Sequence, residues 1–335
     1  MDNSSGAARL PATMSGMRTP KPWPLPTQPI TRELLSAAGV SDEMIRTQLR
    51  SGRLMRLRHG VYLASDAWPT GDAERHVMLA RAEQVTNPTA VISHASAAVV
   101  WGLSTPGFTP WHASAPTVTL PADGPHAWRG TAIRHQALLP SADLARDEGY
   151  TVTSVARTAI DLAGPLPLPE ALAIVDHAAR LIIASYVDEP RRRDYSNPRF
   201  VAAALETLLT TAGRHRSRLQ PMLDLVVPAR ESPAESLTAG YLHLAGTPMP
   251  LFQAEISVGG GKVYPDFFWP DLGLIGEVDG LVKYTDPRAI GAEKQREQHL
   301  LDLGYQIVRW LASEIMTRPD LVVARIERAM AAATR

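Results

Sequence analysis

The sequence feature that most constrains the fold is a pair of short capped helices followed at once by a basic hairpin. One helix is predicted over residues 32–38 and a second over residues 42–50, because each has a side-chain cap before it and glycine after it. Beyond them leucine and valine alternate with arginine around a glycine turn, which is typical of a β-hairpin. Residues 30–64 are therefore predicted to form a winged helix. The caps and turns are Thr31, Gly39, Ser41, Ser51-Gly52 and Gly60.

The second predicted helix and the predicted hairpin are rich in arginine. In a winged helix the second helix enters the major groove and the wing lies on the DNA backbone. Arginine and glutamine can make paired hydrogen bonds to guanine and adenine. The predicted groove contacts are Arg46, Gln48 and Arg50, and the predicted phosphate contacts are Arg53, Arg56, Arg58 and His59. The alternative is a solvated basic surface without a ligand, which five arginines between positions 46 and 58 make less favourable.

The charge of the chain is unevenly distributed. Its formal net charge is zero, yet residues 1–64 carry nine Lys and Arg against four Asp and Glu. Residues 231–320 show the reverse, with thirteen acidic against seven basic residues. A basic end suits a polyanion and an acidic end suits cations. The sequence therefore predicts two separate tasks for the two ends.

Other functional classes are excluded by composition. The chain has no cysteine, which excludes disulfides, thiolate zinc sites and a cysteine nucleophile. It has no apolar run near the ~18–20 residues that span a bilayer, and no apolar stretch typical of a secretory signal at its start. We therefore expect a cytoplasmic protein without a membrane partner.

A chain of 335 residues is longer than most single-domain proteins, so we expect several domains. The expected fold class is α/β, of the α+β type. Alternating prolines predict a disordered tail over residues 1–29. A winged helix over 30–64, a mixed α/β domain over 65–230 and an α/β domain over 231–335 follow. The expected helices are 74–85, 94–102, 155–163, 169–185, 199–212, 235–245, 292–303 and one after Pro319, and the expected strands are 117–120, 131–135, 150–153, 263–269, 274–279 and 305–310.

An acidic hairpin is predicted in the C-terminal domain. If Pro270–Gly273 is a four-residue turn, Asp266 faces Glu277, and like charges so placed are destabilising. Asp279 and Lys283 fall on the same face. A Mg²⁺ ion bound by the carboxylate oxygens would remove the repulsion between these acids. With a lysine beside it, such a metal site would suit phosphodiester cleavage. The alternative is an edge hairpin whose acids face water.

At these residues the chain resembles the very-short-patch-repair-like endonucleases of the PD-(D/E)XK superfamily. The resemblance implies a restriction-endonuclease-like core in which Asp266 and Glu277 bind Mg²⁺ or Mn²⁺ and Glu235 is the acid of the preceding helix. The superfamily has Glu-x-Lys where this chain has Glu277-Val278-Asp279, so Lys283 would supply the lysine. The motifs are Ser232-Pro233-Ala234-Glu235-Ser236, Tyr264-Pro265-Asp266-Phe267-Phe268-Trp269-Pro270, Gly276-Glu277-Val278-Asp279-Gly280-Leu281-Val282-Lys283-Tyr284, Glu293-Lys294-Gln295-Arg296-Glu297 and Gly304-Tyr305-Gln306-Ile307-Val308-Arg309-Trp310.

Three segments of the N-terminal half carry a second resemblance. They are Gly39-Val40-Ser41 through Arg56-Leu57-Arg58-His59-Gly60-Val61-Tyr62, Ile92-Ser93-His94-Ala95-Ser96-Ala97-Ala98 to Trp101-Gly102-Leu103, and Thr153-Ser154-Val155-Ala156-Arg157-Thr158-Ala159-Ile160-Asp161-Leu162-Ala163. In these segments the chain is similar to the AbiEi-type antitoxins of type IV toxin–antitoxin systems. The resemblance implies a winged helix that binds operator DNA, followed by a domain that opposes a nucleotidyltransferase-like toxin.

Several polar residues of the central segment have structural interpretations. Arg157 and Asp161, four residues apart, are predicted to pair on one helix. His94 and His135 are predicted to be structural rather than metal ligands. Asp176 and His177 are adjacent on a helix, so they are not expected to form a dyad.

Two functions remain open on the sequence. The first is a DNA-binding protein whose nuclease-like domain cleaves or nicks DNA with Mg²⁺ or Mn²⁺. The second is a non-enzymatic transcriptional repressor or antitoxin of a type IV system with a degenerate nuclease fold. Both have double-stranded DNA as a partner, and the second adds a cognate toxin protein. Lys283 discriminates between them, since catalysis requires that it reach Asp266 and Glu277.

Overall fold

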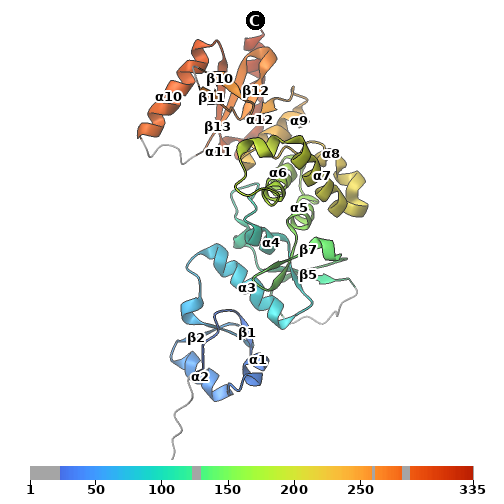
Figure 1. The fold of residues 1–335 in the computed structure, drawn as a ribbon, viewed down its shortest axis with the longest axis vertical. Coiled ribbons are helices and arrows are strands. Elements are labelled where there is room, and N and C mark those ends of the chain that lie inside the picture. The colour runs from blue at the N-terminus through green and yellow to red at the C-terminus, as the bar shows by residue number, and fades with distance from the viewer. Residues whose placement is uncertain (1–22, 123–129, 259–260, 281–286, 335) are drawn as a thin grey trace, which may run out of the picture. The chain divides into compact units, whose positions relative to one another are not determined.

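The computed structural model describes residues 23–122, 130–258, 261–280 and 287–334, without the side chains of Arg214 and residues 287–294. The chain is a mixed α/β protein, as predicted, and it divides into two compact units (Figure 1). Unit 1 is Met1–Ala67 and unit 2 is Trp68–Arg335. Within the described residues, none of the helices combines the length and the apolar character needed to cross a membrane.

Unit 1 is the predicted winged helix. Its three-stranded antiparallel sheet has the order β1-β3-β2, and two helices pack against it. The elements are β1 (Ile30–Thr31), α1 (Arg32–Ala37), α2 (Asp42–Arg50), β2 (Leu54–Arg58), β3 (Val61–Ala64) and the short 3-10 helix η1 (Ser65–Ala67). Thr31 and Ser41 cap α1 and α2 through their side chains, as predicted. The core consists of Leu35, Val40, Ile45, Leu54 and Tyr62.

The segment before β1 is part of unit 1. Trp23 and Leu25 pack against its core, and the backbone N–H of Ala64 donates to the carbonyl of Pro26 at 2.8 Å. The prediction of a disordered tail is therefore wrong for residues 23–29. Prolines forbid a helix there, but an extended chain can still pack through the side chains between them. Residues 1–22 lie outside the described part of the chain.

The first half of unit 2 holds a five-stranded mixed sheet of order β6-β5-β4-β8-β7. β4 pairs parallel with β8 and β5 parallel with β6, and the other pairs are antiparallel. Two of its strands, β4 and β7, were not predicted, and β4 is only two residues long. The elements are α3 (Asp72–Thr86), β4 (Val91–Ile92), α4 (His94–Trp101), η2 (Trp111–Ala113), β5 (Thr117–Pro121), β6 (Ile133–Ala137), η3 (Ser141–Asp143), β7 (Leu144–Asp147) and β8 (Tyr150–Thr153).

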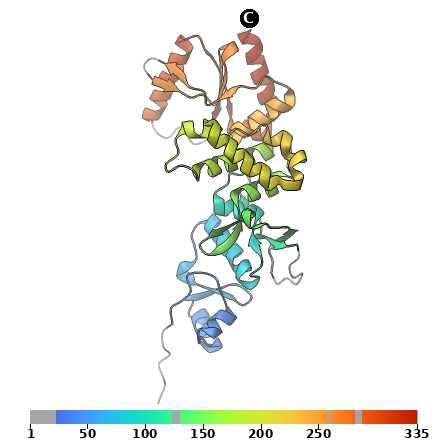
Figure 2. The ribbon, with the colours of Figure 1, turned by 45° about the vertical axis from the view of Figure 1, so that its right-hand side comes forward.

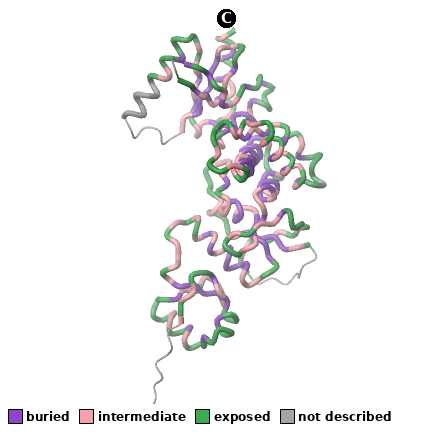
Figure 3. The backbone as a smooth tube through the Cα atoms, viewed as in Figure 1, coloured by how far each residue is buried: buried purple, intermediate pink, exposed green. Residues whose placement is uncertain are grey.

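A helical layer follows the sheet, and α6 lies at its centre, packed against α5, α7 and α9. Figure 3 shows buried residues concentrated along α5 and α6. Gly240 of α9 allows α6 to approach closely, because a Cβ there would lie 2.6 Å from the Cα of Pro169. The elements are α5 (Val155–Ala163), α6 (Leu168–Ala184), η4 (Arg192–Ser196), α7 (Pro198–Ala212), η5 (Gly213–His215), α8 (Arg216–Leu223) and α9 (Pro233–Ala245). A separate domain beginning at residue 231 stays a prediction, since α6 and α9 pack across that position.

The last part of unit 2 is a four-stranded sheet of order β14-β13-β12-β9, with β13 and β14 parallel. Helices lie on both sides of it (Figure 2). The hairpin register is as predicted, with Trp269 opposite Leu274. The expected strand 263–269 is interrupted, because Pro265 cannot donate a ladder hydrogen bond. The elements are β9 (Leu251–Phe252), β10 (Ile256–Val258), β11 (Gly261–Val263), β12 (Phe267–Trp269), η6 (Pro270–Leu272), β13 (Leu274–Asp279), α10 (Pro287–Asp302), β14 (Gln306–Leu311), α11 (Ala312–Thr317) and α12 (Pro319–Ala333).

Candidate functional site

The α2 helix presents two arginines to solvent. The side chains of Arg46 and Arg50 are 65% and 72% exposed. Both pair with Glu43, at 3.3 Å from Arg46 Nη2 and 2.7 Å from Arg50 Nη2. Exposed ion pairs are worth only ~0–1 kcal/mol, so a polyanion can compete for both arginines.

The hairpin adds further basic side chains. Arg53, Arg56 and His59 are exposed, and their side chains have no ion pair or hydrogen bond with the described residues. Arg58 is half-buried, after a β-bulge that separates it from Arg56. The turn needs Gly60, whose φ of +76° disfavours other residues. Arg53 and Arg56 therefore offer exposed positive charge along the wing.

An open hollow of about 320 Å³ lies between α2 and the wing. It brings together three of the predicted DNA contacts, Arg46, Arg56 and His59. Asp42 is also at its wall, but Arg32 pairs with it and lowers the pKa of its carboxyl, chiefly through a side-chain hydrogen bond. The other lining residues are Ile45, Leu49, Gly60 and Tyr62.

Gln48 stands apart from this hollow. Its side chain is half-buried, and the oxygen Oε1 is buried without a hydrogen-bond partner among the described residues. A base contact by Gln48 therefore requires a different rotamer. The prediction for this residue is weaker than for Arg46 and Arg50.

In unit 2, Asp266 of the predicted metal site lies beside β13. Asp266 Oδ2 accepts from the backbone N–H of Val278 at 2.8 Å, and Asp266 Oδ1 accepts from Gln253 Nε2 at 3.0 Å. The register of β12 and β13, extended by one residue, sets Asp266 against Glu277. The two-strand pairing deduced from the turn therefore agrees with the structure.

Glu235 joins Asp266 from the first turn of α9. It is buried, and its carboxylate accepts from Ser232 Oγ at 2.8 Å and from the backbone N–H of Glu231 at 2.9 Å. Burial, and secondly the charge of Asp266, raise the pKa of Glu235 to about 7. Desolvation is thus the larger cause of the raised pKa of Glu235, and its neighbour Asp266 is the smaller one.

Glu277 and Asp279 each form an ion pair with an arginine. Glu277 Oε1 lies 3.4 Å from Arg296 Nη2, and Asp279 Oδ1 lies 3.0 Å from Arg309 Nη1. Within the ranges that the structure describes, no group of three or more His, Asp or Glu side chains could hold a metal ion. Lys283, the predicted catalytic lysine, lies outside the described residues. The donors directed at these carboxylates do not fit a Mg²⁺ or Mn²⁺ site.

Two residues of this cluster were not foreseen. Gln253 Nε2 lies 3.0 Å from Asp266 Oδ1 and 3.3 Å from Glu235 Oε2. Arg192 of η4 donates from Nη1 to Gln253 Oε1 at 2.8 Å and from Nη2 to Glu231 at 3.0 Å. Arg192 and Gln253 are 61 residues apart, and no local pattern connects them. Only the packing of η4 near β9 could reveal the pair.

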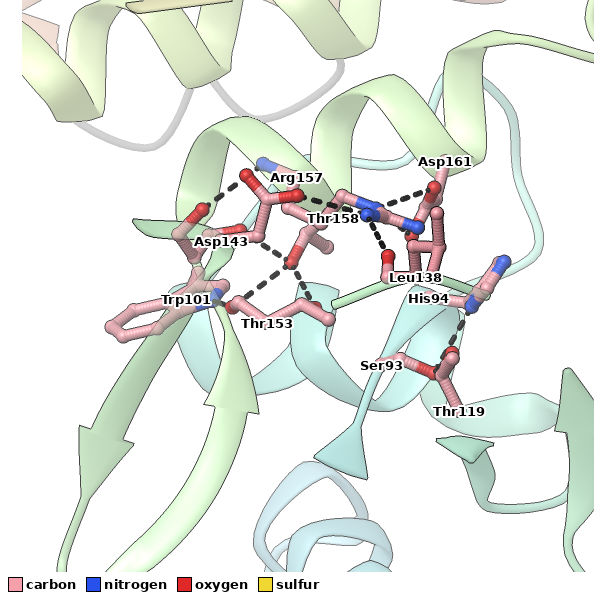
Figure 4. A network of polar contacts seen from close by, with 11 residues as sticks. Ser93, His94, Trp101, Thr119, Leu138, Asp143, Thr153, Arg157, Thr158 and Asp161 are labelled. Carbon is pink, nitrogen blue, oxygen red and sulfur yellow. Dashed lines mark hydrogen bonds and ion pairs between the residues drawn. The ribbon is translucent and has the colours of Figure 1, made fainter. Parts of the chain in front are cut away.

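The polar side chains of Arg157, Asp161, Asp176 and His177 lie on α5 and α6 and bind groups of the chain itself. Arg157 Nε donates to Asp161 at 2.9 Å, and Nη1 donates to Asp143 at 2.9 Å and to the carbonyl of Leu138 at 3.0 Å (Figure 4). Asp176 and His177 bind different groups, Arg230 and the backbone N–H of Ser104. The Arg157–Asp161 prediction is confirmed, and Asp176 and His177 do not form a dyad.

His94 and His135 form a stacked pair with ring centroids 3.7 Å apart. His94 has a φ of +48° and its Nδ1 lies 3.0 Å from Ser93 Oγ (Figure 4). Burial, followed by His135 and Arg157, lowers the pKa of His94 to about 3. Parallel rings cannot direct both lone pairs at one ion, so the geometry favours the structural interpretation.

Known proteins are similar to this chain in two ways. Residues 29–64 match the family described as "Transcriptional regulator, AbiEi antitoxin". Uncharacterized proteins from two strains of Mycobacterium tuberculosis are each 29% identical over 297 residues, which is 86% of this chain and 97% of the relative. The aligned part of this chain is longer than unit 2, so the similarity extends into unit 1. The antitoxin resemblance is confirmed for residues 29–64, and the nuclease resemblance stays a prediction.

Proposed function

We propose that this protein is a DNA-binding transcriptional regulator of the antitoxin type, and that unit 1 contacts double-stranded DNA. The observation that carries the proposal is the hollow at which Arg46, Arg56 and His59 converge. The match of residues 29–64 to an antitoxin regulator family supports it independently.

The two parts of unit 1 have different tasks in this proposal. The α2 helix enters the major groove, where Arg46 and Arg50 exchange Glu43 for base edges. The wing lies along the backbone, where Arg53, Arg56 and His59 meet phosphates. Base contacts give sequence preference, whereas phosphate contacts give affinity for any sequence and make that affinity depend on salt.

The test is a titration of the full chain against two duplexes by fluorescence anisotropy at several salt concentrations. One duplex is the region upstream of its own coding sequence, and the other has a shuffled sequence. Arg56→Ala with Arg58→Ala should weaken binding to both and lower the salt slope by about 0.9 per lost phosphate contact. Arg46→Ala or Arg50→Ala should weaken the upstream duplex more than the shuffled one.

Arg193→Ala is the matched control, because Arg193 is an exposed arginine of unit 2. It should bind as the wild type does. Binding that does not depend on salt, or full binding by the Arg56→Ala, Arg58→Ala double variant, would contradict the proposal.

A cognate toxin is the second partner that we propose, on the basis of the antitoxin match alone. We propose residues 65–230 for that contact, a location that the match does not test. Co-expression with the product of an adjacent gene tests it. Rescue of growth should survive the Arg56→Ala, Arg58→Ala double variant if toxin and DNA are bound by different parts of the chain.

Metal-dependent cleavage, the other function that the sequence indicates, is not proposed here. Its four acids are present, and Glu235 and Asp266 are neighbours. Yet amide and guanidinium N–H groups, rather than further oxygens, face Asp266, Glu277 and Asp279. Such donors favour a closed acidic cluster over a cation site.

A further inference from the structure

We propose that Gln253 and Arg192 form a lock that takes the place of a divalent cation between Glu235 and Asp266. In this lock the amide nitrogen of Gln253 faces the two carboxylates, and the guanidinium of Arg192 holds the amide in that orientation. The inference concerns unit 2 and does not depend on DNA binding by unit 1.

The amide occupies the position at which two acids converge. Nε2 of Gln253 lies 3.0 Å from Asp266 Oδ1 and 3.3 Å from Glu235 Oε2. An amide NH₂ has two donors and no acceptor, so it can serve both carboxylates and cannot bind a cation. It thus weakens the repulsion between the acids in the way a metal would, without one.

The orientation of the amide follows from its other end. Gln253 Oε1 accepts from Arg192 Nη1 at 2.8 Å. Turning the amide over would set NH₂ against the guanidinium donors and the oxygen against two carboxylates. Both contacts would become repulsive, so the arginine fixes which atom of Gln253 the acids meet.

Arg192 is itself held in place from two sides. Its Nη2 donates to Glu231 at 3.0 Å, and its guanidinium lies 5.1 Å from the ring centroid of Tyr264. Glu231 also donates its backbone N–H to Glu235. The lock is therefore tied to the same turn that carries Glu235 at the start of α9.

The backbone of Gln253 is constrained as well. It has a φ of +52°, which is rare for glutamine, and its N–H donates to the carbonyl of Pro265 at 3.1 Å. The preceding Phe252 packs edge-on against Phe267 and under the guanidinium of Arg230, 4.1 Å from the ring centroid. A strained residue persists only where its surroundings determine it, and here they aim its side chain at the acids.

The experiment measures the melting temperature of the full chain in EDTA and in MnCl₂ or MgCl₂. The wild type should show no rise with either metal. Arg192→Ala leaves the amide free to turn its oxygen to a cation, and Gln253→Glu supplies a third carboxylate. Both variants should then melt higher in MnCl₂, on the order of 5 °C at about 100 times the dissociation constant.

Arg193→Ala serves as the control again, because it removes a neighbouring exposed arginine and leaves the lock intact. It should respond to metal no more than the wild type does. Arg192 is 41% exposed, so its removal should leave a folded protein in which metal binding can be measured directly by titration calorimetry.

A manganese response in the wild type equal to that of Arg192→Ala would overturn the proposal, since the lock would then exclude nothing. So would the absence of binding in both Arg192→Ala and Gln253→Glu. Neither result would bear on the DNA titrations, which read unit 1. A failure of the lock and a failure of the proposed function are therefore distinguishable.

Discussion

The arginines of the two units differ in what surrounds them. In unit 1, Arg46 and Arg50 are exposed and their ion pairs with Glu43 are weak. In unit 2 Arg230 is 1% exposed and Arg157 is 13% exposed, and both are bound to carboxylates and carbonyls. A buried guanidinium requires carboxylate or carbonyl partners, whereas an exposed one remains available to a polyanion. The same residue type thus stabilises one unit and equips the other for binding.

The acids follow the same division. Glu43 in unit 1 is solvated and can release its arginines. Asp176, Asp266 and Glu277 in unit 2 receive donors from several elements. Substitutions in unit 2 should therefore change stability, and those in unit 1 should change affinity.

Asp176→Ala should have the largest effect. Asp176 is buried and accepts from Val227 N–H at 2.8 Å, Arg230 Nη1 at 2.7 Å and Ser236 Oγ at 2.6 Å. Its removal leaves the charge of Arg230 buried without compensation, which costs about 3–5 kcal/mol. Urea unfolding measures the loss. Asp224→Ala, at an exposed acid bound to Gln220, is the control, and a loss below about 1 kcal/mol for Asp176→Ala would contradict the comparison.

Arg157→Ala should lower the free energy of unfolding by about 2–3 kcal/mol, since Asp143, Asp161 and the carbonyl of Leu138 lose their donor. Thermal unfolding measures it, and DNA affinity should not change. Arg146→Ala is the matched control, because Arg146 is exposed and donates to the carbonyl of Gly149 in a turn. Loss of DNA binding without loss of stability would show a functional role for Arg157.

His94→Asn should remove part of the acid sensitivity. The pKa of His94 is lowered to about 3 by burial, so between pH 6.5 and 3 the unfolded chain binds a proton that the folded chain does not. Stability should therefore fall as the pH drops, by up to about 2 kcal/mol from pH 7 to 5. Asparagine tolerates the positive φ of this position. Urea midpoints at pH 8, 7 and 5 should fall less steeply for the variant, and equal slopes would refute the prediction.

Glu43→Gln should have the smallest effect. It releases Arg46 and Arg50 from their exposed ion pairs, so affinity for both duplexes should rise a few-fold at low salt. The anisotropy titration measures it. Because salt screens exposed charges, the gain should vanish at about 0.5 M salt. A decrease in affinity would mean that Glu43 orients the arginines for DNA.

Local patterns determined much of the molecule from the sequence. The bounds of α2, α5, β8 and β13 agree with those expected, because caps, glycines and hydrophobic periods act within a few residues. The pairing of Trp269 with Leu274 and the contact of Arg157 with Asp161 also depend on short spacings. The open basic face of unit 1 could be expected for the same reason, since its helix and hairpin are adjacent in the chain.

The tertiary structure decided what depends on distant segments. β4 is only two residues long and is fixed by its neighbours β5 and β8. The donors that bind the acids of unit 2 likewise come from distant segments of the chain. Arg309 binds Asp279 across 30 residues, and Arg192 binds Gln253 across 61. The sequence determined the hairpin register that sets Asp266 against Glu277. Only the packing of η4, α9 and β14 determined that nitrogen donors of this chain would bind these acids. The physical reason is that a buried carboxylate binds whichever donor the fold brings within reach.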